Sequence, residues 1–243
     1  FELTFYHIHF GAGYSITDDI LLYADMPLGI YLHNEKYNDE QYHPNGEPIT
    51  PEELTGLVKT RPSYSLVQPA YFALGGRYKL TEGIFFSSLK AELRIPPGFD
   101  ESILNDPDYP FLSDGAFVFL TGAALGVDLN GVKLGGQIDY YVRGEELEDQ
   151  LSAMFELGLS TVEDTELRGY VRSVSSMAGW DNAYPINPRE TPLQEEYINV
   201  GFSFEMLIND IFRGTFAYEL PLSGKNTYNM GVFMLRFSYL MKS

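Results

Sequence analysis

Hydrophobic and polar residues alternate along most of this chain in runs of about ten residues. In residues 197–208, for example, every second residue is hydrophobic, while the residues between include Asn199, Ser203 and Glu205. Because neighbouring side chains of a β-strand point to opposite faces, a period of two predicts a strand with one hydrophobic face. The same pattern predicts eleven strands, centred near residues 8, 26, 75, 90, 121, 137, 155, 170, 202, 216 and 234.

Short and long connections alternate between these strands. Short turns are expected at residues 17–19, 81–83, 129–131, 162–164 and 209–210, and the Asn130-Gly131 pair favours a tight hairpin. Longer polar connections are expected at residues 33–68, 96–114, 144–149, 177–196 and 222–226. Outer-membrane barrels show this asymmetry, with short periplasmic turns and long extracellular loops.

The pattern therefore predicts an all-β fold, a transmembrane antiparallel up-and-down β-barrel that forms a single domain over residues 1–243. Long extracellular loops are expected near residues 33–68, 96–114 and 177–196. Single-chain barrels of this kind usually have an even number of strands and both termini in the periplasm. We therefore expect about twelve strands, the first of them preceding Phe1, and a periplasmic C-terminus.

The predicted register separates the side chains of each strand into a lipid face and a lumen face. Lipid is expected to contact Val132, Leu134, Leu157, Leu159, Phe202 and Phe204. The opposite faces carry ten of the sixteen basic residues. So many charges would be costly in a dry core, so they indicate a hydrated or salt-bridged lumen. The expected lumen or constriction residues are Arg77, Lys90, Glu92, Arg94, Lys133, Asp139, Arg143, Glu156, Arg168, Arg172, Glu205, Arg213, Glu219 and Arg236.

Two finer expectations concern contact with a solute. Inward side chains of neighbouring strands must meet, because the strands lie about 4.8 Å apart. A charged constriction is therefore expected from Arg143, Arg168, Arg172 and Arg213 with Asp139, Glu156, Glu205 and Glu219. An apolar inward stripe of Tyr228, Met230, Val232 and Met234 could contact a hydrophobic solute or pack against a loop inside the barrel.

Composition excludes several other classes of function. The net charge of −18 disfavours a nucleic-acid partner, which would need clustered basic residues. The absence of cysteine excludes disulfides and thiolate metal sites. Most of the acidic excess lies in the long connections, where it fits a solvated surface. Calcium binding by the acidic residues of segment 100–114 is an alternative, although no EF-hand spacing is present.

Candidate catalytic and metal-binding residues are few. His7 and His9 share one strand face and could bind a metal, but the sequence offers no third ligand beside them, and ordinary lumen positions explain both. No GxSxG motif is present, so an embedded lipid hydrolase acting through these histidines is the weakest alternative. We therefore expect no catalytic residue, no metal and no cofactor.

Several segments resemble a known family. They are GAGYSITDDILLYADMPLGIY (residues 11–31), YFALGGRYKL (71–80), LKAELRIPPGF (89–99) and AYELPLSGKNTYNMGVFMLRFSYL (217–240). Together they are similar to outer-membrane channels associated with the meta-pathway of phenol degradation, which are relatives of the long-chain fatty-acid transporters. The connection 33–68 and the residues that end the last strand have no match in that pattern.

The resemblance implies a channel for passive uptake of small hydrophobic or aromatic compounds, rather than an enzyme. The alternative from the residues alone is a structural or scaffolding barrel, closed by salt bridges, in an outer-membrane protein assembly. The expected location is the outer membrane of a Gram-negative bacterium. The expected partners are outer-membrane lipids and lipopolysaccharide, a small hydrophobic solute and, for the scaffolding alternative, envelope proteins.

Overall fold

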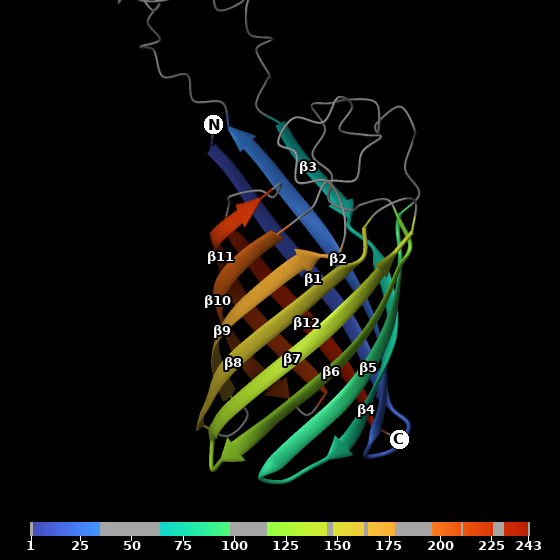
Figure 1. The fold of residues 1–243 in the computed structure, drawn as a ribbon, viewed down its shortest axis with the longest axis vertical. Coiled ribbons are helices and arrows are strands. Elements are labelled where there is room, and N and C mark those ends of the chain that lie inside the picture. The colour runs from blue at the N-terminus through green and yellow to red at the C-terminus, as the bar shows by residue number, and fades with distance from the viewer. Residues whose placement is uncertain are drawn as a thin grey trace, which may run out of the picture.

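The computed structural model describes residues 2–34, 64–97, 116–144, 148–162, 165–177, 196–209, 211–225 and 231–242 (Figure 1). Within them the chain forms strands and no helix. No helix able to cross a membrane therefore occurs among these residues. The strands are β1 (Glu2–Ser15), β2 (Ile20–Asn34), β3 (Tyr64–Pro69), β4 (Phe72–Thr81), β5 (Phe85–Ile95), β6 (Val118–Leu129), β7 (Val132–Arg143), β8 (Gln150–Val162), β9 (Thr165–Ser176), β10 (Glu196–Asn209), β11 (Phe212–Lys225) and β12 (Val232–Lys242).

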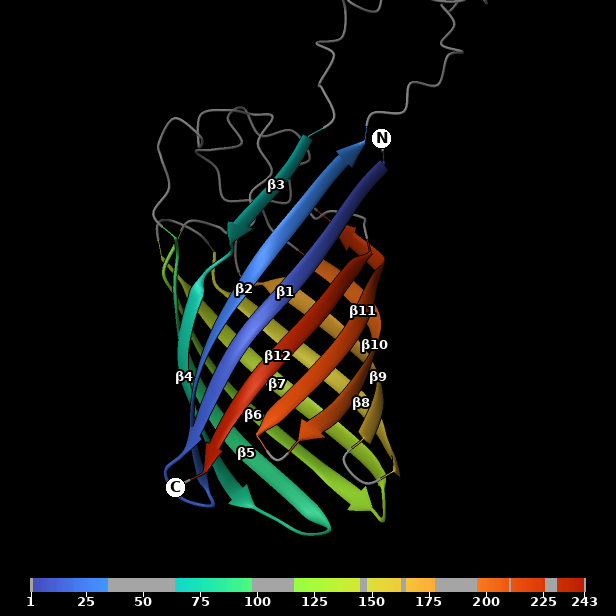
Figure 2. The ribbon, with the colours of Figure 1, turned by 180° about the vertical axis from the view of Figure 1, so that it is seen from behind.

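Eleven of these strands close into a tall barrel with tilted strands (Figures 1 and 2). Each strand from β4 to β12 is antiparallel to the next along the chain, and β2 pairs with both β1 and β4. The all-β up-and-down barrel of about twelve strands predicted from the sequence is confirmed. The eleven predicted strand centres all fall within the closed wall.

The barrel closes where β1 lies beside β12, and this one pair is parallel (Figure 2). The reason is topological, because an odd number of up-and-down strands brings the first and the last strand into the same direction. The register runs from Phe5 opposite Val232 to Ser15 opposite Lys242. Stacked rings also join the two strands, with centroids 5.7 Å apart for Tyr6 and Phe233 and 6.5 Å for Phe10 and Phe237. The expected strand before Phe1 lies outside this sequence and stays a prediction.

Strand β3 corrects the prediction that residues 33–68 form one loop. It pairs with residues 28–33 of β2, while β4 pairs with residues 20–25 of the same strand. The long strand β2 would otherwise leave the hydrogen-bonding groups of its second half unpaired at an edge. β3 therefore continues the line of β4 beyond the closed wall, as the teal arrow of Figure 1 shows. Its six residues are too short for a clear alternation, which explains why the sequence pattern missed it.

All the turns that the structure describes between consecutive strands lie at one end of the barrel, and the C-terminus lies there too (Figure 1). The turn between β6 and β7 has the predicted Asn130-Gly131 pair, with positive φ angles of 53° and 95°. Both residues of this tight hairpin turn need that conformation, which asparagine and glycine tolerate best. The longer connections start and end at the opposite end. We call the two ends the short-turn end and the long-connection end.

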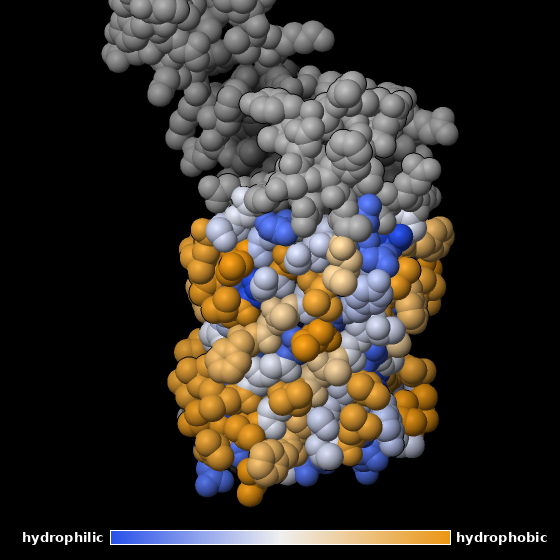
Figure 3. Space-filling view, in the orientation of Figure 1, coloured by the Kyte–Doolittle hydropathy of each residue, from blue (hydrophilic) through white to orange (hydrophobic). Residues whose placement is uncertain are grey.

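On the face shown in Figure 3, many hydrophobic side chains cover the outer wall, with polar residues among them. The six side chains predicted to face outward, at positions 132, 134, 157, 159, 202 and 204, are exposed, with exposed fractions from 36% to 44%. On β6 the alternation is complete: Val118 and Leu120 are buried inside, while Phe119 between them is 47% exposed. The predicted division of these strands into an outer and an inner face is therefore confirmed.

Candidate functional site: a charged lumen

Polar and charged side chains line the lumen, and several of them are buried, among them Asp25, Asp139 and Glu219. The fourteen charged residues predicted to line it all fall on the inward alternation of their strands, which they share with buried neighbours such as Ala73, Ser152, Val174 and Ala217. The side chains form five groups, four near mid-height and one near the short-turn end. Each group joins neighbouring strands of the wall.

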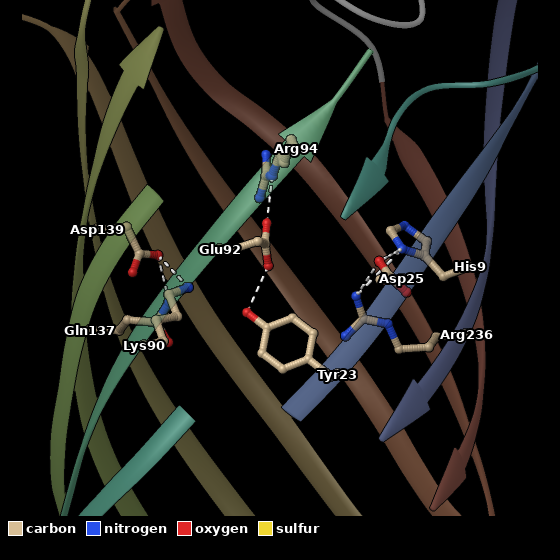
Figure 4. A network of polar contacts seen from close by, with 9 residues as sticks. All are labelled: His9, Tyr23, Asp25, Lys90, Glu92, Arg94, Gln137, Asp139 and Arg236. Carbon is tan, nitrogen blue, oxygen red and sulfur yellow. Dashed lines mark hydrogen bonds and ion pairs between the residues drawn. The ribbon is translucent and has the colours of Figure 1, made fainter. Parts of the chain in front are cut away.

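The first group lies behind the seam between β1 and β12. His9 and Asp25 are both buried, with the His9 Nδ1 atom 2.9 Å from the Asp25 carboxylate (Figure 4). Arg236 reaches the same carboxylate oxygen at 3.2 Å from β12, across β1. Three strands are therefore tied together at one buried carboxylate. His7, two residues away on β1, places its ring 5.7 Å from that of His9.

The second group centres on Glu92 of β5. The Tyr23 hydroxyl donates to one carboxylate oxygen at 2.8 Å, and Arg94 Nε donates to the other at 2.6 Å (Figure 4). The Arg94 guanidinium in turn lies over the rings of Tyr71 and Tyr141, at 4.7 and 5.3 Å from their centroids. Cation–π contacts of this kind hold the guanidinium in place on both faces.

The third group is a buried ion pair between β5 and β7. Lys90 Nζ lies 3.0 Å from Asp139, whose side chain is 7% exposed, and Gln137 donates to the same oxygen at 2.6 Å (Figure 4). The fourth group lies on the opposite wall, where Glu219 of β11 forms a comparable centre that joins three strands. It accepts hydrogen bonds from Tyr170, Arg172 and Asn199.

The fifth group is an arc of alternating charge near the short-turn end, which we call the charged arc. It runs over five strands through Lys133, Glu166, Arg168, Glu205 and Arg213. Lys133 and Arg168 bind the two oxygens of Glu166 at 2.9 and 2.7 Å. Arg213 lies 3.2 Å from Glu205, and Arg168 lies 3.9 Å from it.

A cavity of about 210 Å³ opens beside the charged arc. Its lining residues come from β7 to β11 and are polar with one exception. They are Lys133, Ser160, Thr165, Glu166, Glu205, Leu207 and Arg213. Leu207 is the apolar member of this set. The cavity therefore offers two cationic side chains, two hydroxyl groups and one apolar contact at the same place.

Several of these contacts cross an intervening strand, and some of the crossings pass over a glycine. Three arrangements share this geometry: Tyr23 reaches Glu92 over Gly75, Tyr170 reaches Glu219 over Gly201, and Lys90 reaches Asp139 over Gly122. A methyl group on any of the three glycines would overlap the side chain that lies across it. We call these arrangements glycine crossings. They let a side chain lie flat along the wall and contact a strand two positions away.

The single constriction predicted from the sequence does not form as one ring. Its members divide between groups at different heights, because Asp139 pairs with Lys90, Arg172 with Glu219, and Arg213 with Glu205. Glu156 lies beside Gly135 on the inner wall, outside the arc and the cavity lining. Arg143 lies at the long-connection end of β7, where its backbone N–H donates to Asp149. Arg77 faces the lumen opposite Lys90 in the β4–β5 register.

The predicted apolar stripe is only partly described. Tyr228 and Met230 lie outside the described residues. Val232 opens β12, and Met234 shares the inward alternation of Arg236. Both are half-buried and pair in register with β1.

The set of lumen residues predicted from the sequence left out five polar residues that hold the groups together: Tyr23, Gln137, Glu166, Tyr170 and Asn199. All five lie on the inward alternation, so the alternation could have selected them. A second signal was available in the inward glycines, which mark the places where a contact crosses a strand. Among the described residues, no group of three or more His, Cys, Asp or Glu side chains is placed to hold a metal ion. Searches of protein-family models and of curated proteins found no match to this chain.

Proposed function

We propose that the protein is an outer-membrane channel for passive uptake of small hydrophobic or aromatic compounds. The observation that carries this proposal is the division of the wall, with charged networks inside and exposed hydrophobic side chains outside. A water-soluble barrel would have the opposite arrangement, because exposed hydrophobic patches of that size are rare on soluble proteins. In a lipid bilayer, the hydrophobic outer face would contact the hydrocarbon chains of the lipids.

The orientation follows from the asymmetry of the two ends. Outer-membrane barrels place short turns in the periplasm and long loops outside the cell. The short-turn end, with the C-terminus, would then face the periplasm, and the charged arc would lie at the periplasmic mouth. The outer wall would contact membrane lipids and lipopolysaccharide.

The arrangement of the lumen contacts supports a route for solute. Each polar contact described above lies within one strand or joins strands that are neighbours or are separated by one strand. Such contacts follow the wall, so they line the lumen without spanning its diameter. The inner aromatic side chains Tyr71 and Tyr141 could contact the body of a hydrophobic solute. The choice of cargo class itself rests on the family resemblance.

A flux measurement with an Arg168→Ala, Arg172→Ala double variant tests the channel. Both side chains occupy the lumen, on one strand at two heights, so their removal should widen the passage and raise the flux of small solutes into liposomes. Lys79→Ala is the matched control, because Lys79 pairs with Asp19 and Glu82 at the exposed short-turn rim. Unchanged flux in a folded double variant would contradict a conducting lumen.

Membrane insertion has its own test in Leu157→Arg. Leu157 is 43% exposed on the outer wall, so an arginine there should destabilise the inserted barrel by about 2 to 4 kcal/mol if it lies near the bilayer midplane. Refolding titrations in urea with lipid vesicles would measure the loss. Glu156→Arg is the comparison, because Glu156 precedes Leu157 on the same strand and its side chain points into the lumen. Equal tolerance of the two substitutions would argue against lipid contact.

A second candidate is a closed structural barrel in an envelope assembly. The observation that favours it is the packing of the long-connection half, where Leu120 is fully buried and Arg94 lies between two tyrosine rings. A folded protein that admits no small solute in the flux experiment would support this candidate. In that case the lumen networks would serve to hold the wall together.

A further inference from the structure

We propose that the cavity beside the charged arc binds the carboxylate of a small monocarboxylate solute with an apolar body. This inference deepens the proposed channel function, on which it rests, by naming a chemical class of solute. The site lies on the inner wall at the short-turn end and is built by strands β7 to β11. It is separate from the four groups near mid-height.

The sequence of charges along the arc determines which sign of ligand the cavity favours. Each of the two acids has two basic neighbours: Glu166 contacts Lys133 and Arg168, and Glu205 contacts Arg168 and Arg213. The arc begins and ends with a cation, so its five charges sum to +1. Both acids are already satisfied, while each terminal cation has a single acidic neighbour in the arc.

The terminal cations also retain hydrogen-bond donors for a ligand. Lys133 has three N–H donors, and its contact with Glu166 uses one of them. Arg213 contacts Glu205 through NH1, and its side chain is 42% exposed, so the guanidinium end keeps further N–H donors within reach of a ligand. A carboxylate in the cavity would accept hydrogen bonds from the donors that these two contacts leave over.

The rest of the lining selects the kind of anion. Ser160 and Thr165 bring hydroxyl groups that can donate to a carboxylate oxygen, while Leu207 offers an apolar surface on the same wall. Inorganic phosphate has no apolar part to contact Leu207. Its higher charge would also be repelled more strongly by Glu166 and Glu205 than the single charge of a carboxylate. A monocarboxylate with one ring matches one charge, several donors and one apolar contact. It also matches the size of the cavity, which far exceeds the space of a single water molecule.

Binding to the detergent-solubilised protein tests the site without requiring transport. Benzoate is the probe, benzyl alcohol is its uncharged counterpart, and inorganic phosphate is the anion without an apolar body. We expect benzoate to bind and the other two to bind at least tenfold more weakly. Isothermal titration measures the dissociation constants, and circular dichroism confirms that each variant retains its β-structure.

Two variants should move the affinity in opposite directions. Arg213→Gln removes a terminal cation and should weaken benzoate binding at least tenfold, whereas Glu205→Gln frees Arg213 from its acidic partner and should strengthen it. Arg77→Gln, which removes a lumen cation outside the cavity, should leave the affinity unchanged. A loss that is equal in all three variants would contradict the assignment.

The remaining outcomes separate this proposal from the channel itself. If benzoate does not bind to the folded protein, or if phosphate binds equally well, the site is not a monocarboxylate site. If benzoate binds but liposomes admit no solute, the binding site stands and the channel proposal fails. If solute flux is present but Arg213→Gln binds benzoate like the unmodified protein, the channel stands and this site is wrong.

Discussion

Gly122→Ala should destabilise the barrel by about 3 kcal/mol or more, although it adds one methyl group. The added carbon would overlap the Asp139 carboxylate and lie 2.8 Å from Cε of Lys90. The ion pair that crosses this glycine would have to separate, and breaking a buried ion pair costs about 3 to 5 kcal/mol. Equilibrium unfolding in urea, followed by tryptophan fluorescence or circular dichroism, measures the change in the free energy of unfolding.

Gly169→Ala is the matched control for this experiment. Gly169 also lies within a strand, but an added methyl group there has nothing within 4 Å. Alanine has fewer backbone conformations than glycine in the unfolded chain, so less conformational entropy is lost on folding. This variant should therefore be neutral or slightly stabilised. If both variants lose the same stability, the cost comes from the strands in general and the glycine crossing has no special role.

A disulfide across the seam should form in the Ile8→Cys, Leu235→Cys variant and should stabilise the barrel by about 5 kcal/mol in the chain-entropy view. The two positions face each other in the parallel register of β1 and β12. The bond would close a loop that includes nearly the whole chain, which gives a large entropic effect on the unfolded state. The chain contains no cysteine, so no other thiol can compete. Mobility on non-reducing gels measures formation of the disulfide. Unfolding with and without reductant measures the stabilisation.

The comparison variant is Ile8→Cys, Phe233→Cys. Phe233 pairs with Tyr6, two residues from Ile8, so its Cα atom would be about 8 Å away from that of Ile8 by the spacing and rise of the strands. A disulfide cannot span that distance without moving the backbone. We therefore expect little cross-linking in this pair. If neither pair cross-links in the folded protein, β1 and β12 are not neighbours in the register described.

The strands of the barrel wall were predicted well from the sequence. Each strand has a hydrophobic outer face and a polar inner face, and this requires a strict alternation of residue types. β7 is an example: its hydrophobic and charged residues alternate from Val132 to Arg143, and an Asn-Gly turn precedes it. β3 was missed because six residues with a proline at their end carry little of that pattern. Its formation depends on the unpaired half of β2, which is a property of the folded sheet.

The site was predicted less completely than the wall. Alternation identified which charges face inward, including Lys90, Asp139 and Arg213. It could not identify their partners, because those depend on the relative shift of strands that are far apart in sequence. Arg172 and Glu219, for example, are separated by 47 residues and meet across β10. The inward glycines contained part of this information, since each glycine crossing needs one at the position between the two partners.

The parallel seam also determines the order of events during folding. Every other pair in the closed wall joins strands that are consecutive along the chain or are separated only by β3, whereas the seam joins β1 to β12. Contacts with such large sequence separation form late, because the entropy of closing the chain must be lost before the contact stabilises it. Parallel pairing is also slightly weaker per residue than antiparallel pairing. We therefore expect an open, curled sheet as the last intermediate, and protection of the seam amides from hydrogen exchange to appear after that of the hairpins.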